Sequence, residues 1–204
     1  MKSKNLLLIA FRLTAVAAFT LFATLPLAAQ GARDPLQGTY FSTGAQACLV
    51  SPLGFTNQAP NNVALAFVQS ASLQGTYTFR ADGTGTAQFK ELVITHPPAT
   101  NAGASSTEQS FSFTHTVAHD GSLTVVTGLV SGTILTGSLQ NVKFTLADSP
   151  LMTGRIERNG TDIALSTTDP SVETLILELS QPLALPRLCH RSRILIPVHV
   201  NEEN

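Results

Sequence analysis

Charged residues and tryptophan are the scarce classes in this 204-residue chain. Only 12% of the residues are charged, and there are two cysteines, two methionines and no tryptophan. This charge content is about half that of a typical soluble domain, which excludes a chain kept disordered by charge repulsion. Twelve basic residues against 13 acidic ones also exclude a nucleic-acid binder that relies on a basic surface. The 43% hydrophobic content is ordinary for a globular protein.

The motifs of common catalytic sites are missing as well. The sequence contains no GxSxG nucleophile elbow, no Walker A loop, no GxGxxG fingerprint and no HExxH zinc motif. We therefore expect a protein that is not an enzyme and that uses no cofactor or metal ion. A hydrolase whose site assembles only on folding is kept as an alternative, because serine, histidine and acidic residues are all present.

The N-terminus has the order of zones that is typical of a secretory signal peptide. Lys2, Lys4 and Arg12 are basic, an uncharged and largely apolar run follows from Leu13 to Leu25, and small residues come after Pro26. We expect a signal peptide over residues 1–31, with cleavage near 28–31, and a single domain over 32–204. A membrane anchor is the alternative, but the run is short for a span of roughly 20 residues. Loss of the three basic residues changes the net charge from −1 to −4.

Two cysteines lie in the exported part, Cys48 near its start and Cys189 near its end. An even count in an oxidising compartment favours a disulfide between them. Two buried free thiols are the alternative. Metal binding is less favoured, because neither cysteine has a partner at CxxC spacing. We expect a secreted or periplasmic protein with one disulfide.

Apolar residues alternate with polar ones along most of the remaining chain. Leu73, Gly75, Tyr77 and Phe79 share one face of a predicted strand, and Asp82-Gly83 turns the chain into the next. Similar runs recur over Phe111–Val117, Val142–Leu146, Met152–Ile156, Ile163–Leu165, Val172–Leu179 and Ile194–Val200. We predict an all-β fold, an antiparallel meander of about ten strands that closes as a barrel, with a β-sandwich as the alternative. Two loops, 51–62 and 97–110, are expected to interrupt it.

One pair of motifs joins the two ends of the exported chain. Gly38-Thr39-Tyr40 opens the first predicted strand, and Arg191 and Arg193 enter the last. This arrangement resembles lipocalin-like (calycin) β-barrels, which carry a Gly-x-aromatic motif on the first strand and an arginine on the last. The resemblance implies that Arg191 or Arg193 lies across the ring of Tyr40, and that the interior binds a small apolar ligand. The alternative is that both arginines are solvent-facing charges on an edge strand.

These patterns lead to two hypotheses from different classes. The first is an exported, monomeric β-barrel binding protein for a small hydrophobic molecule, with no membrane span after cleavage. The second is a structural or interaction protein of the cell envelope, with a filled core and functional loops. A cavity of about 300 Å³ or more would favour the first. The residues expected to bind the ligand are Tyr40, Tyr77, Phe79, Phe89, Phe111, Phe113, Arg191 and Arg193.

Overall fold

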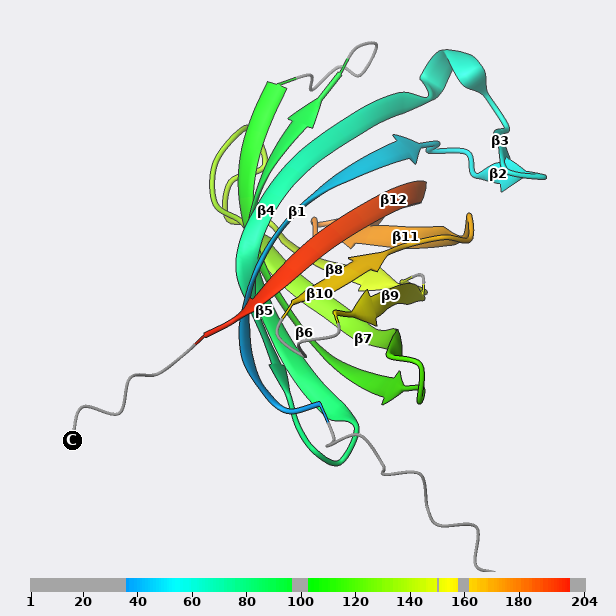
Figure 1. Cartoon of the computed structure of the whole chain (residues 1–204). Helices are drawn as coiled ribbons and strands as arrows, with labels where there is room; N and C mark the ends of the chain where they lie inside the picture. Colours follow the sequence, from blue (N-terminus) through cyan, green and yellow to red (C-terminus); the bar gives the residue numbers. More distant parts are fainter. Residues whose placement is uncertain (1–35, 97–102, 150, 158–161, 199–204) are drawn as a thin grey trace, which may run out of the picture. The chain divides into compact units, whose positions relative to one another are not determined.

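A computed structural model describes residues 36–96, 103–149, 151–157 and 162–198. These residues form one large antiparallel sheet of ten strands (Figure 1). Its strands are β1 (Gly38–Val50), β4 (Phe67–Phe79), β5 (Thr84–Thr95), β6 (Gly103–Val117), β7 (Ser122–Ile134), β8 (Lys143–Ala147), β9 (Met152–Ile156), β10 (Ile163–Ser166), β11 (Val172–Leu177) and β12 (Leu183–Pro197). A small hairpin of β2 (Phe55–Thr56) and β3 (Ala59–Pro60) precedes a 3-10 turn, η1 (Val63–Leu65). The predicted all-β class is therefore confirmed.

The sheet closes on itself because its first and last strands pair. β1 lies between β4 and β12 (Figure 1). In the β1–β12 ladder, Cys48 stands directly opposite Cys189. Eight strands complete the ring in the order β1-β4-β5-β6-β7-β8-β11-β12. The predicted closure of the antiparallel meander is thus confirmed by the pairing of strands from opposite ends of the chain.

One stretch of the ring is divided into two short two-stranded ribbons instead of continuous strands. One ribbon is β8 with β11, and the other is β9 with β10. The first half of β7 pairs with β9, and its second half pairs with β8. On the other side, β12 pairs with β11 through its first half and with β10 through its second. No ladder joins β8 to β9, or β11 to β10, within the part of the chain that the structure describes. We call this line between the two ribbons the seam.

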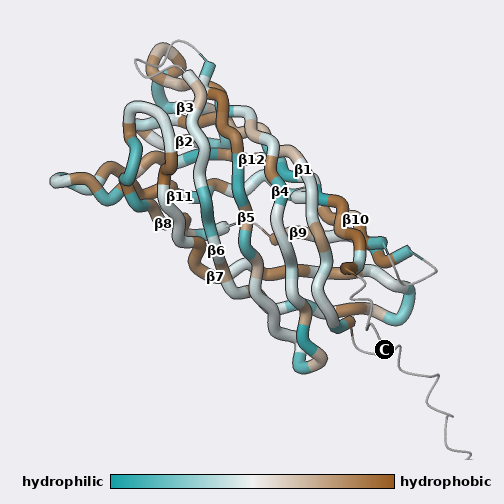
Figure 2. Tube along the Cα trace, turned by 90° about the vertical axis from the view of Figure 1, so that its left-hand side faces the viewer, coloured by the Kyte–Doolittle hydropathy of each residue, from teal (hydrophilic) through white to brown (hydrophobic). Residues whose placement is uncertain are grey.

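The alternation seen in the sequence separates the two faces of the sheet. Leu73, Tyr77 and Phe79 of β4 are buried inside the ring, while Gln74 between them is exposed. Hydrophilic, neutral and hydrophobic segments accordingly succeed one another along the strands in Figure 2. The predicted turn at Asp82-Gly83 joins β4 to β5, and Asp82 accepts a 2.9 Å hydrogen bond from the amide of Thr84. Period-two patterning has therefore identified the inner face correctly.

Two other expectations need correction or lie outside the described residues. The predicted loop 97–110 is wrong over 103–110, which belong to β6 and pair with β5. There the inward positions are taken by polar residues, buried Thr107 and half-buried Gln109, which alternate with exposed Glu108 and Ser110. Loop 51–62 is present and holds the β2–β3 hairpin. The predicted signal peptide and its cleavage site lie outside the described residues. Among the residues that are described, no helix is long and apolar enough to cross a membrane.

Candidate functional site

Among the described residues, five ionisable side chains of arginine and glutamate point into the middle of the ring. Arg187, Arg191 and Arg193 occupy alternate inward positions of β12, Glu173 comes from β11, and Glu91 comes from β5. All five are buried, with exposed fractions between 0% for Glu173 and 8% for Arg191. The alternative that Arg191 and Arg193 are solvent-facing charges is therefore wrong. Closure of the ring turns this face of β12 inward, where an edge strand would have left it in water.

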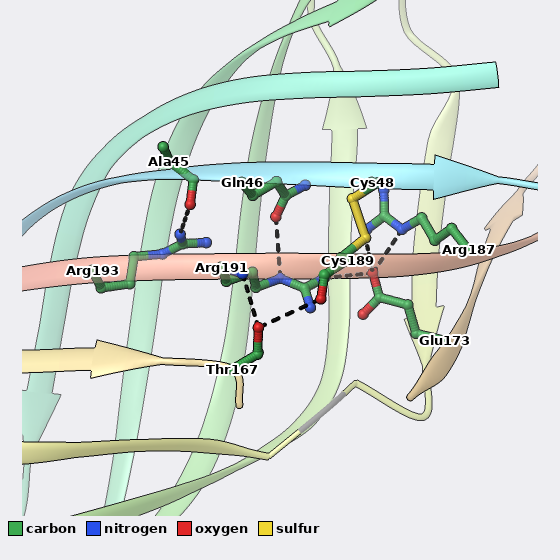
Figure 3. A network of polar contacts seen from close by, with 9 residues as sticks. All are labelled: Ala45, Gln46, Cys48, Thr167, Glu173, Arg187, Cys189, Arg191 and Arg193. Atoms are coloured by element: carbon green, nitrogen blue, oxygen red, sulfur yellow. Dashed lines mark hydrogen bonds and ion pairs between the residues drawn. A yellow bond between two sulfur atoms is a disulfide. The ribbon is translucent and has the colours of Figure 1, made fainter. Parts of the chain in front are cut away.

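Glu173 is the centre of a network of ion pairs (Figure 3). One carboxylate oxygen, Oε1, accepts a hydrogen bond of 2.7 Å from Arg187 Nε and another from Arg191 Nη2. Burial alone would raise the pKa of Glu173, but attraction to Arg187 and Arg191 and the hydrogen bonds from both outweigh it and lower the pKa. Arg191 Nε also donates to Gln46 Oε1 at 3.1 Å. Glu173 is thus held as a carboxylate between two guanidinium groups.

Arg193 lies apart from this ion pair and contacts backbone and aromatic groups. Its Nη1 donates to the carbonyl oxygens of Ala45 at 2.9 Å and Ser192 at 2.8 Å. Its guanidinium carbon lies 6.0 Å from the centre of the Phe89 ring, within the range of a cation–π contact. The guanidinium therefore rests on an aromatic ring, but the ring is not the one expected from the sequence.

The expected contact between Tyr40 and the arginines is wrong. In the β1–β12 ladder Tyr40 stands opposite Pro197, while Arg193 stands opposite Gly44, four residues further along β1. Four strand residues correspond to about 13 Å. The Tyr40 ring instead packs edge-on against Phe79, with 5.5 Å between ring centres. The register of the first and last strands, which the sequence did not specify, decides this outcome.

Glu91 is the second buried acid, and it forms no ion pair within the described residues. Its Oε1 has no hydrogen-bond partner there. Burial raises the pKa of Glu91, and attraction to Arg187, Arg193 and Arg191 reduces this effect without cancelling it. The cluster thus holds three guanidinium groups, from Arg187, Arg191 and Arg193, against two carboxyl groups, from Glu91 and Glu173. The cluster carries an excess of positive charge.

The predicted Cys48–Cys189 disulfide is confirmed, and it lies inside the ring. It joins directly opposite residues of β1 and β12 across a sequence separation of 141. Cys189 Sγ lies 3.2 Å from Glu173 Oε1. Because both sulfurs are bonded to each other, neither is a thiolate that could bind a metal ion together with Glu173. The bridge fixes the closure of the ring next to the charged cluster (Figure 3).

The aromatic residues expected to bind a ligand come together and fill the core. The ring of Tyr77 has its centre 5.2 Å from Phe89, 5.4 Å from Phe113 and 5.9 Å from Phe79. Phe111 joins the same group, 5.9 Å from Phe89. The cavity left beside these rings and the arginines has a volume of about 30 Å³. Side chains therefore occupy the space in which a small organic ligand was expected.

A larger hollow lies on the outer face of the sheet. This groove has a volume of about 840 Å³ and crosses β1, β4, β5, β6, β7 and β8. Two adjacent rows of outward residues line it, each made of directly opposite residues on neighbouring strands. The first row is Gln74, Lys90, Glu108, Thr133 and Lys143, and the second is Phe41, Thr76, Gln88, Ser110 and Ser131.

Sequence reasoning missed two features of these sites, the inward polar residues and the rows that line the outer groove. The inward positions of three strands hold the polar residues Glu91, Glu173 and Gln46. The alternation of apolar and polar residues could have marked these positions as inward. A polar residue is usually taken to face solvent, so they were not recognised. The outer rows depend on strand register, which a single sequence specifies poorly.

Comparison with known proteins identifies no family for this chain. No protein-family model, no curated protein and no solved structure matches it.

Proposed function

We propose that this protein is an exported, non-catalytic binding protein that holds a hydroxyl-rich ligand, such as an oligosaccharide, in the outer groove. The observation that carries the proposal is the volume of the groove, about 840 Å³. Binding sites for small molecules occupy about 300–1,000 Å³. The interior cavity of about 30 Å³ falls far below this range. We therefore assign the ligand to the outer face of the ring and change its expected chemistry from apolar to polar.

The side chains of the groove support a polar, extended ligand. Neighbouring strands are about 4.8 Å apart, so each row presents a polar group at regular intervals across the sheet. Amide and hydroxyl groups such as Gln88 and Ser110 can both donate and accept hydrogen bonds, which suits a ligand with many hydroxyl groups. Phe41 is 43% exposed at one end of the groove and offers a ring face for stacking. The Cys48–Cys189 disulfide is consistent with an exported protein.

Binding to an array of oligosaccharides, followed by calorimetry on the bound class, tests this proposal. A ligand that covers the exposed half of the Phe41 ring gains about 1–1.5 kcal/mol, so Phe41→Ala should weaken binding about 5–12-fold. Gln88→Ala should also weaken it. Leu92→Ala, which alters an exposed β5 residue outside the groove lining, is the matched control and should leave the affinity unchanged. The proposal fails if no oligosaccharide binds, or if Phe41→Ala and Gln88→Ala both bind like the control.

A second candidate function is that of a structural or interaction protein of the cell envelope with functional loops. It is favoured by the filled interior and by the region around the β2–β3 hairpin, where Leu53, Val63 and Leu65 are 58%, 76% and 51% exposed. Exposed apolar side chains that gather in this way commonly mark an interaction surface. Site-specific photo-crosslinking from Val63 in the native host should then yield one defined adduct, and crosslinking from Thr116 should not. Absence of any adduct at Val63 would remove this candidate.

A further inference from the structure

Several buried polar atoms around the small interior cavity have no hydrogen-bond partner among the described residues. It lies among Arg187, Arg191, Arg193, Gln46 and Tyr77, with Ser149 on the side of the seam. Arg191 Nη1, Arg193 Nε and Ser149 Oγ are buried and have no hydrogen-bond partner within the described residues. Leaving such groups unpaired costs about 1–3 kcal/mol each, and more for charged ones. Three of the cavity's residues therefore carry a donor that lacks an acceptor.

We propose that this cavity is a binding site for one small inorganic anion of halide size, held by Arg191 and Arg193. This site is separate from the outer groove, and the proposal does not depend on the function assigned to that groove. An anion can accept hydrogen bonds from several donors at once, and Arg191 Nη1 and Arg193 Nε are two donors without a partner among the described residues. It also supplies the negative charge that the surrounding residues lack.

The positive charges around the cavity are only partly balanced by acidic partners. Glu173 is engaged by Arg187 and Arg191 through a single oxygen, and no ion pair involves Arg193 within the described residues. Glu91 is the other acid that faces the cluster, and it contacts none of the three arginines through an ion pair. A buried cation without a counter-charge is costly, because the interior screens it far less than water does. One bound anion beside Arg193 removes this imbalance.

The size of the cavity limits what can occupy it. A volume of about 30 Å³ is enough for a water-sized occupant, and it is about a tenth of the lower end of the range for small-molecule sites. A halide ion is of this size class, whereas a sugar acid such as gluconate belongs with the much larger small-molecule ligands. A single water molecule would fit, but it would neutralise no charge. The distinction between water and anion is therefore the one that the experiment has to make.

Thermal unfolding at constant ionic strength tests the proposal in solution. The purified protein is compared in sodium chloride and in sodium gluconate, whose anion is too large for the cavity. If chloride binds only the folded protein, the Tm should rise by about 5–10 °C at a chloride concentration 100 times the Kd. Arg193→Met should lose this shift, since it keeps an unbranched apolar stem without the charge and leaves the Glu173 ion pairs intact. Arg80→Met, at an exposed arginine beside the β4–β5 turn, should keep it.

Bromide supplies a second measurement that does not depend on any variant folding. Crystals of the unmodified protein grown or soaked in bromide should show an anomalous peak within hydrogen-bond distance of Arg191 and Arg193. An ordered water at that place with no anomalous signal would overturn the proposal, even if bromide sites appear elsewhere on the surface. A Tm that is equal in chloride and gluconate would overturn it as well, and so would a chloride shift that Arg193→Met retains.

Discussion

Replacement of Glu173 by glutamine is the sharpest test of how the interior is stabilised. Glutamine has the same shape and keeps one acceptor oxygen, but it removes the only carboxylate that forms ion pairs inside the ring among the described residues. Glu173 is fully buried, so water does not reach the arginines to solvate them when the carboxylate is gone. Glu173→Gln therefore isolates the contribution of charge from that of volume.

The expected cost follows from the two hydrogen bonds that Arg187 and Arg191 donate to Glu173 Oε1. Each is a charge-assisted bond worth about 1.5–3 kcal/mol, and a neutral amide oxygen would restore only about 0.5–1.5 kcal/mol of each. The remaining excess of unpaired guanidinium charge adds to the loss, and breaking a buried pair typically costs 3–5 kcal/mol. We expect a loss of about 3 kcal/mol in the free energy of unfolding, or a fall in Tm of about 6–12 °C.

Urea denaturation at several pH values measures this effect. The pKa of Glu173 lies below its ordinary value of 4.5, so its stabilising effect is present above pH 4.5 and is lost as the pH falls through the folded-state pKa. The gap between the unmodified protein and Glu173→Gln should therefore be constant near neutrality and should narrow below pH 4.5. Glu178→Gln, at an exposed residue just beyond β11, is the matched control and should change stability by less than about 0.5 kcal/mol. A Glu173→Gln variant no less stable than this control would refute the reasoning.

Two further predictions concern the same interior. Burial raises the pKa of Glu91 above its ordinary value of 4.5, so its ionisation destabilises the fold as the pH rises from 4.5 through the folded-state pKa. Glu91→Gln should therefore raise the Tm at pH 7 and leave the Tm unchanged at pH 4. An equal change in Tm at both pH values would contradict this. Replacing both Cys48 and Cys189 by serine opens a loop of 141 positions. Chain entropy then predicts a loss of about 4–5 kcal/mol in the free energy of unfolding. A loss under about 1 kcal/mol, measured by urea denaturation, would show that the β1–β12 pairing holds without the bridge.

Much of the fold was predictable because it depends on local patterns. Alternation in β4 placed Leu73, Tyr77 and Phe79 on one face, and the Asp-Gly turn fixed where the chain reverses. The disulfide followed from composition and from the positions of the two cysteines. These features require no knowledge of which distant residues meet. The sequence therefore predicted the all-β class, the inner face of its strands and the joining of the chain's ends.

The charged interior was not predictable by the same means, because it depends on register and closure. Tyr40 and Arg193 lie on adjacent strands, as expected, yet a difference of four positions along β1 separates the tyrosine from Gly44, the partner of Arg193. Charged residues at alternate positions are usually solvent-facing, which kept open the alternative that Arg191 and Arg193 face solvent, and nothing in the sequence singled out Arg187. Only the closed ring shows that this face has no solvent side.

Inward-facing glycines provide a signal that could have located the charged cluster. A side chain at Gly44 would collide with the backbone oxygen of Ser192 at 2.1 Å and with Arg193 Cδ at 2.8 Å. Gly75 stands in the same relation to Phe89, directly opposite it on β5. In both cases the missing side chain is what admits a large neighbour to the crowded interior. Gly44→Ala should therefore displace the Arg193 stem and disturb the arginine cluster, whereas the neighbouring change Ala45→Ser, at an outward position, should not.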